Sequence, residues 1–359
     1  MSELTDGAVL DALRAVTDPD LGRDIVGLGF VKNLAIRDGH VAFSIELTTP
    51  ACPVKEQMRE QALSAVSALD GVTGVDIEMT AAVRSAATPE GGRAPIPGIR
   101  NIIAVGAGNG GVGKTTVAVN LAVALARYGG RVGIIDADVY GPNVPIMLGI
   151  DAQLESDGKK IVPAEKYGIR VVSMGFLTNA SAPIIWRGPM LHGVVRQFFQ
   201  DVRWGELDYL VVDMPPGTGD VALSLSQTVP VAGAVVVTTP QTVSISDSRR
   251  AVAMYQKLNV PPLGIVENMS FYNCPGCGQE SDLFGKGGGE RIAEELSVPF
   301  LGRLPVYPPV RVGSDTGVPI VVAEPESAVA RAFLDIAAHA AAQVSIATYQ
   351  QPTPAAPVA

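Results

Sequence analysis

A glycine-rich run, residues 108–115, has the residue types and spacing of a phosphate-binding loop. It reads GNGGVGKT and matches the pattern G-x-x-x-x-G-K-[ST] in full. Glycines let backbone N–H groups surround phosphate oxygens, and the N-terminus of the helix that follows adds partial positive charge. We expect Lys114 to reach the β- and γ-phosphates and Thr115 to give Mg²⁺ an oxygen ligand. The residues expected to bind the nucleotide here are Gly108, Asn109, Gly110, Gly111, Val112, Gly113, Lys114, Thr115 and Thr116.

Three aspartates follow apolar runs that are typical of buried strands. Asp136 and Asp138 follow an Ile-Ile pair, and Asp213 follows Leu-Val-Val. The carboxyl ends of parallel strands meet at one edge of a sheet, where ligands bind. We expect Asp138 and Asp213, together with Lys114, to be catalytic, by serving Mg²⁺ or an attacking water. Asp136 is explained equally well as a cap on the helix that follows it.

A Cys-x-x-Cys motif, Cys274-Pro-Gly-Cys277, lies in a Gly/Pro-rich loop. Such a turn holds two thiolates close enough for one metal centre, but tetrahedral Zn²⁺ and a [4Fe–4S] cluster each need four ligands. The simplest completion is a two-fold homodimer in which each chain gives two thiolates. A shared cluster and a structural zinc fit the spacing equally well. A redox disulfide is a third alternative, although such pairs usually sit at a helix N-terminus.

The third cysteine, Cys52, follows Thr-Pro-Ala at the expected start of a helix. A helix N-terminus lowers the pKa of a thiol and makes it reactive, in which case Cys52 would help to receive or hand over iron or cluster. A lone cysteine is also often a small buried hydrophobic residue. The sequence favours neither interpretation.

A long α/β unit over residues 100–348 positions the phosphate loop, the aspartates and the Cys-x-x-Cys motif. Its continuous apolar runs are typical of strands that are buried on both faces, and amphipathic segments lie between them. This alternation predicts a doubly wound, mostly parallel sheet. The expected strands include Ile102–Val105, Val132–Ile135, Leu210–Val212 and Ala234–Val237.

A small α+β domain over residues 1–84 precedes that unit. Period-two alternation over residues 41–48 after an Asp38-Gly39 turn predicts a hairpin with residues 31–36. Helices are expected over residues 6–16 and 54–69, and a third strand over residues 72–79. Residues 85–99 have the composition of a linker, and residues 349–359 that of a disordered tail.

Composition excludes several classes of protein. The 359 residues carry a net charge of −9 with no long Lys/Arg run, which argues against nucleic-acid binding and against charge-driven membrane binding. No stretch approaches the roughly 20 apolar residues of a membrane span. Acidic residues among the first twenty argue against a signal peptide. Three cysteines exclude a disulfide framework and predict a cytoplasmic location.

The motifs along the chain resemble those of a known family of ATPases. Residues 100–345 resemble the deviant-Walker ATPases, whose branches include division-site positioning, partitioning and nitrogenase iron proteins. The runs DADVYGPNVP, DMPPGTGD, ENMSFYNCPGCG and GRLPVYPPVR resemble those of the Mrp/Nbp35-type iron–sulfur cluster carriers. The N-terminal runs TDPDLGRDIVGLGFV and LTTPACP resemble the MIP18-like domain of bacterial members and assembly factors.

The resemblance implies an ATP-binding carrier that passes a labile [4Fe–4S] cluster to apo-proteins, with assembly factors as further partners. It implies that Asp138 orients the hydrolytic water, that Asp213 lies behind Mg²⁺ and that Asn268 contacts adenine. It shifts the interpretation of Cys274 and Cys277 from zinc towards a cluster.

One position departs from the family pattern. Relatives usually carry a lysine where this chain has Asn109, and that lysine reaches the nucleotide of the partner subunit. Asparagine is short and neutral, so we expect nucleotide binding through Lys114 and only slow ATP hydrolysis. Two alternative functions remain: a positioning or partitioning ATPase, and a zinc-bridged scaffold that binds nucleotide as a structural ligand. The first should end in a basic amphipathic helix, which this chain lacks.

Overall fold

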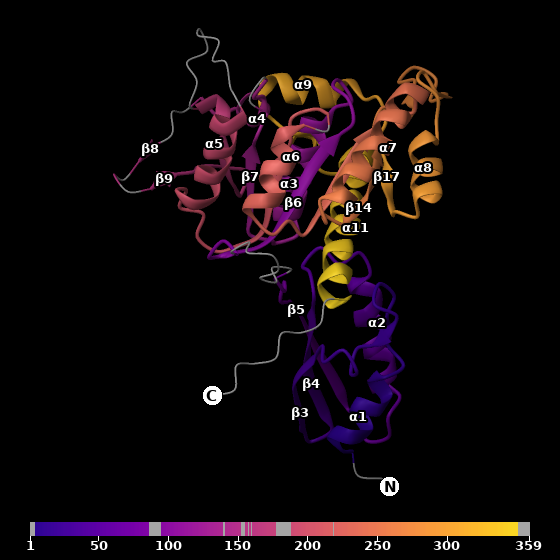
Figure 1. Cartoon of the computed structure of the whole chain (residues 1–359). Helices are drawn as coiled ribbons and strands as arrows, with labels where there is room; N and C mark the ends of the chain where they lie inside the picture. Colours follow the sequence, from indigo (N-terminus) through magenta and orange to yellow (C-terminus); the bar gives the residue numbers. More distant parts are fainter. Residues whose placement is uncertain are drawn as a thin grey trace. The chain divides into compact units, whose positions relative to one another are not determined.

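The structure is a computed structural model of the whole chain (Figure 1). It describes residues 4–85, 95–138, 141–151, 155–156, 158, 160–176, 188–217 and 219–350. The chain divides into two compact units, Met1–Arg84 and Ser85–Ala359. Most of the expected linker (residues 86–94) and of the expected tail (residues 351–359) lies outside the described residues.

The N-terminal unit is a three-stranded sheet with two helices, in the order β3-β4-β5. The predicted hairpin is confirmed: β3 and β4 are antiparallel, and Asp38 (φ 50°) and Gly39 (φ 79°) form the turn with positive φ at both positions. The alternating apolar side chains of β4 are buried, together with side chains of α1 and α2. The elements are α1 (Asp6–Leu13), β1 (Thr17–Asp18), β2 (Arg23–Asp24), β3 (Val31–Arg37), β4 (His40–Leu47), α2 (Lys55–Ser67) and β5 (Gly74–Ala81).

The second unit is built on an eight-stranded sheet in the order β10-β11-β7-β12-β6-β13-β14-β17. All neighbouring pairs are parallel except β10 with β11, which confirms the predicted, mostly parallel architecture. The strands are β6 (Ile99–Ala107), β7 (Val132–Asp136), β10 (Ala164–Lys166), β11 (Ile169–Ser173), β12 (Leu207–Asp213), β13 (Gly233–Thr238), β14 (Pro262–Glu267) and β17 (Phe300–Arg303). Two short pairs lie outside the sheet, β8 (Glu155–Ser156) with β9 (Ile161–Val162) and β15 (Tyr272–Asn273) with β16 (Glu280–Ser281).

Helices cover both faces of this sheet, as a doubly wound fold requires. The cluster that includes Ile102 and Ala104 of β6 packs against α5, α6, α7 and α8, whereas α3 and α11 pack together on the other face. Alternate residues of each buried strand thereby face opposite helical layers. The helices are α3 (Lys114–Arg127), α4 (Val144–Leu148), α5 (Gly188–Gln200), α6 (Asp220–Thr228), α7 (Thr242–Lys257), α8 (Gly288–Leu296), α9 (Pro308–Thr316), α10 (Ile320–Ala323) and α11 (Ala328–Gln350), with a 3₁₀ turn at Met174–Phe176.

Two boundaries differ from the composition-based expectation. Strand β6 begins at Ile99, which the composition assigns to the linker, and α11 continues to Gln350, two residues into the expected tail. Ile99 is buried in the core of the second unit, and the last turn of α11 simply extends a helix that is packed further back. Composition alone therefore assigns Ile99 to the linker and the end of α11 to the tail, although these residues belong to the neighbouring strand and helix.

The parallel strands bring the chemistry-bearing residues to one edge. Asp213 at the end of β12 pairs in register with Asp136 at the end of β7 and with Val105 of β6, which the phosphate loop follows. Glu267 at the end of β14 pairs with Thr238 at the end of β13. In the part of the chain that the structure describes, no helix combines the length and apolarity needed to cross a bilayer.

Candidate functional site

The predicted phosphate loop runs from the end of β6 into the first turn of α3. Gly111 (φ 81°) and Gly113 (φ 80°) adopt left-handed conformations that residues with a Cβ rarely tolerate. Gly108 packs so closely against the backbone of Asp247 that a side chain there would collide with it. Gly113 is the N-cap of α3, and the first N–H groups of a helix have no partner within the helix. The loop thus meets the backbone requirements of a phosphate cradle.

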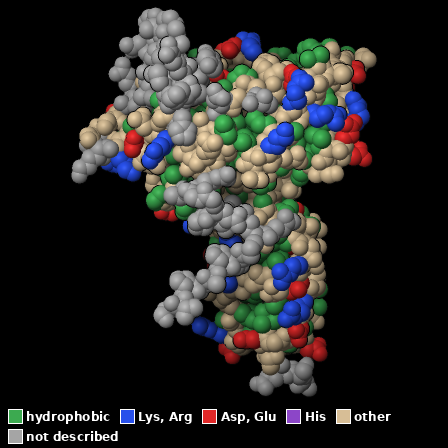
Figure 2. Space-filling model, viewed as in Figure 1, with side chains coloured by type: hydrophobic (Ala, Val, Ile, Leu, Met, Phe, Trp, Pro, Cys, Tyr) green, Lys and Arg blue, Asp and Glu red, His purple; other side chains and the backbone are tan. Residues whose placement is uncertain are grey.

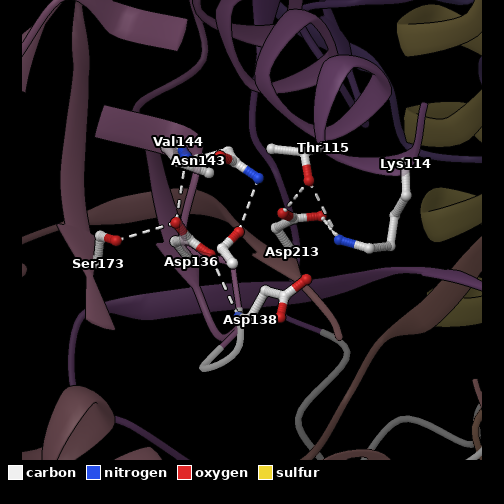
Figure 3. Close-up of polar contacts among 9 residues, drawn as sticks. Lys114, Thr115, Asp136, Asp138, Asn143, Val144, Ser173 and Asp213 are labelled. Carbon is white, nitrogen blue, oxygen red and sulfur yellow. Dashed lines mark hydrogen bonds and ion pairs between the residues drawn. The ribbon is translucent and has the colours of Figure 1, made fainter. Parts of the chain in front are cut away.

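Lys114, Thr115 and Asp213 form one hydrogen-bonded group (Figure 3). The Nζ of Lys114 lies 2.5 Å from Oδ1 of Asp213, and the hydroxyl of Thr115 donates to Oδ2 at 2.7 Å. Asp213 is fully buried and Lys114 nearly so. Burial raises the pKa of Asp213, and the Lys114 cation opposes that rise. A hydroxyl and a carboxylate held together in this way match the oxygen ligands that Mg²⁺ prefers, beside a cation suited to phosphate.

Asp136 is a structural carboxylate. It is fully buried and accepts hydrogen bonds from Oγ of Ser173 (2.9 Å), the backbone N–H of Val144 (3.1 Å) and that of Asp138 (3.2 Å). Val144 is the first residue of α4, so Asp136 caps that helix, in agreement with the second interpretation of this residue. Burial, with repulsion from Asp213, raises the pKa of Asp136 to about 7.

Asp138 lies at the same edge and is only partly buried. Figure 3 shows its carboxylate on the side of Asp213, and its negative charge contributes to the raised pKa of Asp213. Asp136, Asp138 and Asp213 therefore gather as the strand pattern predicts. They differ in burial: Asp136 and Asp213 are fully buried, whereas Asp138 is partly exposed.

Asn268 contacts the phosphate loop directly. Its Nδ2 donates to the carbonyl of Val112 at 2.8 Å and lies where a Cβ on Gly113 would fall. Asn109, two residues into the loop, accepts from the hydroxyl of Ser244 in α7 at 3.3 Å. Both asparagines predicted to contact nucleotide are thus held by hydrogen bonds at the phosphate loop, Asn268 to Val112 and Asn109 to Ser244.

The Cys-x-x-Cys motif closes a short hairpin between β15 and β16. The backbone N–H of Cys274 donates to Gln279 (3.0 Å), and the N–H of Gly278 donates to the carbonyl of Cys274 (2.8 Å). Hydrogen bonds from the backbone N–H groups of Cys277 and Gly276, and then from the Cys277 thiol, lower the pKa of Cys274. Cys274 is half-buried and Cys277 exposed, so the hairpin presents a thiolate-prone pair to the surface.

The hairpin offers two sulfur ligands and no more. Among the residues that the structure describes, no group of three or more His, Cys, Asp or Glu side chains is arranged to hold a metal ion. A four-coordinate centre at Cys274 and Cys277 therefore needs ligands from elsewhere.

Cys52 lies between β4 and α2 in the N-terminal unit, with 9% of its surface exposed. Burial raises the pKa of its thiol to about 11, although the backbone N–H of Val54, next to the start of α2, acts in the opposite direction. The structure supports the interpretation of Cys52 as a small buried hydrophobic residue. The helix N-terminus does not make this thiol reactive, because desolvation outweighs it.

Sequence patterns did not single out three polar residues of this site: Ser173, Ser244 and Glu267. Ser173 supports Asp136, and Ser244 supports Asn109. Glu267 ends the apolar strand β14 as Asp136 and Asp213 end theirs, so the same strand-end pattern would have revealed it. The two serines carry no comparable local signal.

Comparison with known proteins identifies the family. Residues 98–341 match the family described as NUBPL iron-transfer P-loop NTPase, and residues 6–78 match the family of iron–sulfur cluster assembly proteins. An "iron-sulfur cluster carrier protein" of Synechocystis sp. is 51% identical over 96% of this chain and 99% of its own length. The chain belongs to the iron–sulfur cluster carrier family.

Other relatives of this carrier family are similar over most of the chain. The carrier protein of Escherichia coli is 38% identical over 96% of both chains. The chloroplastic Fe-S cluster assembly factor HCF101 of Arabidopsis thaliana is 45% identical over 94% of this chain and 63% of its own length. The match to the N-terminal unit means that the family assignment covers both units.

Solved structures place the carrier among nucleotide-binding P-loop folds. A nucleotide-binding protein from Archaeoglobus fulgidus, solved with ADP, superposes with a TM-score of 0.57 and 37% identity over 65% of this chain and 91% of that one. The cell division ATPase MinD of Pyrococcus furiosus superposes with a TM-score of 0.52 and 25% identity over 67% of this chain and 97% of that one. The fold of the second unit is thus shared with a nucleotide-binding protein and a cell division ATPase.

Proposed function

We propose that this chain is an ATP-binding carrier that holds a labile [4Fe–4S] cluster between two copies of itself and passes it to apo-proteins. The observation that carries the proposal is the hairpin with two preorganised thiol ligands, Cys274 and Cys277, and no third. A two-fold axis at the hairpin supplies the missing two thiolates. Transfer then exchanges these thiolates for those of the acceptor, without a net change in oxidation state.

An exposed apolar pair supports a homodimer at the hairpin. Leu283 and Phe284 follow β16 within a few residues and are 59% and 43% exposed. Large apolar side chains at a surface are typical of interaction sites when they lie together. Packed against the same pair of a second copy, they would shield the cluster from water.

The nucleotide site fits Mg²⁺–ATP. Lys114 carries the cation that neutralises phosphate charge, and Thr115 and Asp213 supply oxygen ligands for Mg²⁺. Asp138, the accessible carboxylate of the group, is suited to orient the attacking water. Bound Mg²⁺ would neutralise charge on the phosphates. Asn109 is held by Ser244 of its own chain and has no positive charge, so hydrolysis is slow.

We also propose a cytoplasmic location, since all three cysteines are free and a labile cluster requires a reducing compartment. Nucleic acid and membrane are not expected partners. On the face that Figure 2 shows, Lys and Arg side chains lie near Asp and Glu side chains, and the whole chain carries a net charge of −9.

The test is anaerobic reconstitution with iron and sulfide, followed by transfer to an apo-enzyme that needs a [4Fe–4S] cluster. The wild-type chain and Cys52→Ala should acquire iron, sulfide and visible absorption and should activate the acceptor. Cys274→Ala should do neither. A zinc-bridged scaffold predicts zinc in place of iron after reconstitution, and a cluster undiminished in Cys274→Ala would refute the proposed ligands.

A further inference from the structure

The cysteine hairpin belongs to a single excursion of the chain from the sheet. Strand β14 ends at Glu267, and the next helix, α8, begins at Gly288; the β15–β16 hairpin lies between them. We name residues 268–287 between these points the cysteine excursion. In Figure 1, β14 and α8 lie on the side of the second unit that also carries α7 and β17. How this excursion is anchored determines where Cys274 and Cys277 are held.

One buried carboxylate closes both ends of the cysteine excursion. Oε1 of Glu267 accepts from the hydroxyl of Ser270 (2.5 Å) and the N–H of Gly287 (2.9 Å), and Oε2 accepts from the N–H of Gly289 (2.5 Å). Glu267 is fully buried. Three donors and the positive end of α8 stabilise its charge, which burial alone would disfavour. A Cβ at Gly289 would lie 2.9 Å from that of Glu267, so only glycine permits this approach.

The next residue, Asn268, fastens the same point to the phosphate loop. Its side chain donates to the carbonyl of Val112, and its backbone N–H donates to Thr238 of β13 at 2.8 Å. Met269 then takes a left-handed conformation (φ 55°), and its N–H donates to Oδ1 of Asn268 at 2.9 Å. A residue with a Cβ is unfavourable in that region, so its surroundings hold the turn in place.

Only a few residues separate this turn from the cysteines. The N–H of Ser270 donates to Leu304 (2.9 Å), and the carbonyl of Phe271 accepts from Val306 (2.6 Å). The hairpin strand β15 begins directly afterwards, at Tyr272, and leads into Cys274. The backbone between Asn268 and Cys274 is therefore short, and it is hydrogen-bonded to the segment that follows β17.

We propose that Glu267 and Asn268 are positioning residues that couple the phosphate loop to the cysteine excursion. Nucleotide binding engages the backbone of the loop at Val112 and Gly113, where Asn268 rests. A shift of Asn268 moves its neighbour Glu267, and Glu267 holds both ends of the excursion. Nucleotide thereby changes the accessibility of Cys274 and Cys277. This inference rests on the nucleotide binding proposed above, but it does not depend on a cluster.

The test measures alkylation of the metal-free, reduced, full-length chain by iodoacetamide, with and without saturating Mg²⁺–ADP. Peptide mass spectrometry gives separate rate constants for Cys274 and Cys277, and the buried Cys52 serves as internal reference. In the wild type, nucleotide should change the rate constants of the pair by about five-fold or more, the range of ordinary couplings between sites. The ratio of rates with and without nucleotide is the readout.

Glu267→Gln replaces one of the two acceptor oxygens of the carboxylate with an NH₂ group, which cannot accept from Gly287 or Gly289. Asn268→Ala removes the hydrogen bond to the carbonyl of Val112. Both variants should bind nucleotide at raised concentration, and their rate ratios should fall to about one. Glu290→Gln is the matched control, because Glu290 lies in the first turn of α8 but is exposed and pairs with Arg303. That variant should keep the wild-type ratio.

If Glu267 has only a structural role, Glu267→Gln should change the alkylation rates with and without nucleotide by the same factor. The ratio of the two rates would then equal that of the wild type, and this result would overturn the proposal. So would a wild-type ratio of one at saturation. If Glu267→Gln does not fold, Ser270→Ala removes one donor alone and should bring the ratio closer to one, whereas an unchanged ratio would again overturn the coupling. Because the assay contains no iron, a wild-type ratio of one together with intact cluster transfer refutes this inference without touching the proposed function.

Discussion

Lys114 and Asp213 are 99 residues apart in the sequence, yet their charged groups are 2.5 Å apart at the buried edge of the sheet. The pair connects the start of α3 with the end of β12. Its cation and carboxylate are the groups expected to meet phosphate and Mg²⁺. The contact pairs two buried charges in the free protein, and we propose that the same two groups bind phosphate and Mg²⁺ when nucleotide is present.

Replacing Lys114 with methionine keeps the length of the side chain and removes its charge. We expect Lys114→Met to lose nucleotide binding and to lower the free energy of unfolding at neutral pH by about 3 kcal/mol, because Asp213 is left buried without its cation. Fluorescent-nucleotide titration and urea denaturation measure the two effects. Adding Asp213→Asn should restore part of the stability but not the binding. Wild-type affinity in Lys114→Met would contradict the assignment of the phosphate loop.

The carboxyl group of Asp136 predicts a pH dependence of stability. Its pKa is raised from 3.8 to about 7, so the folded state binds this proton more tightly than the unfolded state. The free energy of unfolding should therefore fall as pH rises from about 4 to 7, by up to about 1.4 kcal/mol per pH unit, and should level off above that range. Asp136→Asn should flatten this decline in urea denaturation at a series of pH values. An identical slope in the variant would show that other groups cause it.

Asn109 predicts slow turnover that a single substitution accelerates. Asn109→Lys introduces a positive charge where the family resemblance predicts one, and phosphate release should rise by about ten-fold or more, because cations near the transferred phosphoryl group stabilise its transition state. Asn109→Gln, which adds length without charge, is the control and should leave the rate low. Brisk hydrolysis by the wild type, unchanged by lysine, would refute this explanation.

The thiols of the two units should titrate far apart. Backbone and thiol hydrogen bonds lower the pKa of Cys274 from 9.0, whereas burial raises that of Cys52 to about 11. Because the thiolate is the reactive form, the alkylation rate of Cys274 should reach half of its plateau below pH 9, and that of Cys52 near pH 11. Cys277→Ala removes one of the hydrogen bonds and should raise the midpoint of Cys274. Equal midpoints for Cys274 and Cys52 would contradict the hairpin geometry.

Local sequence patterns predicted the elements whose signals are local. The apolar runs predicted the buried strands, the turn at Asp38 predicted the hairpin, and the glycine loop was placed correctly between β6 and α3. The strand-end rule also gathered Asp136, Asp138 and Asp213, because parallel strands share one edge whatever their order in the sheet.

Features that depend on long-range packing could not be predicted. The burial of Cys52 results from the packing of the N-terminal unit, and this burial raises the pKa of its thiol against the effect of the helix N-terminus. The contact between Asn268 and Val112 joins residues 156 positions apart. Glu267 reaches Gly289 across the whole cysteine excursion. No periodicity or motif encodes such contacts, so the link between the phosphate loop and the cysteines is visible only in three dimensions.

Native mass spectrometry of the anaerobically reconstituted full-length chain tests the central claim most directly, because it counts chains and metal atoms in one species. The account predicts a species of two chains with one [4Fe–4S] cluster, and single chains without iron for Cys274→Ala. A cluster on a single chain, a dimer bridged by one zinc ion in place of iron, or a cluster retained by Cys274→Ala would contradict it.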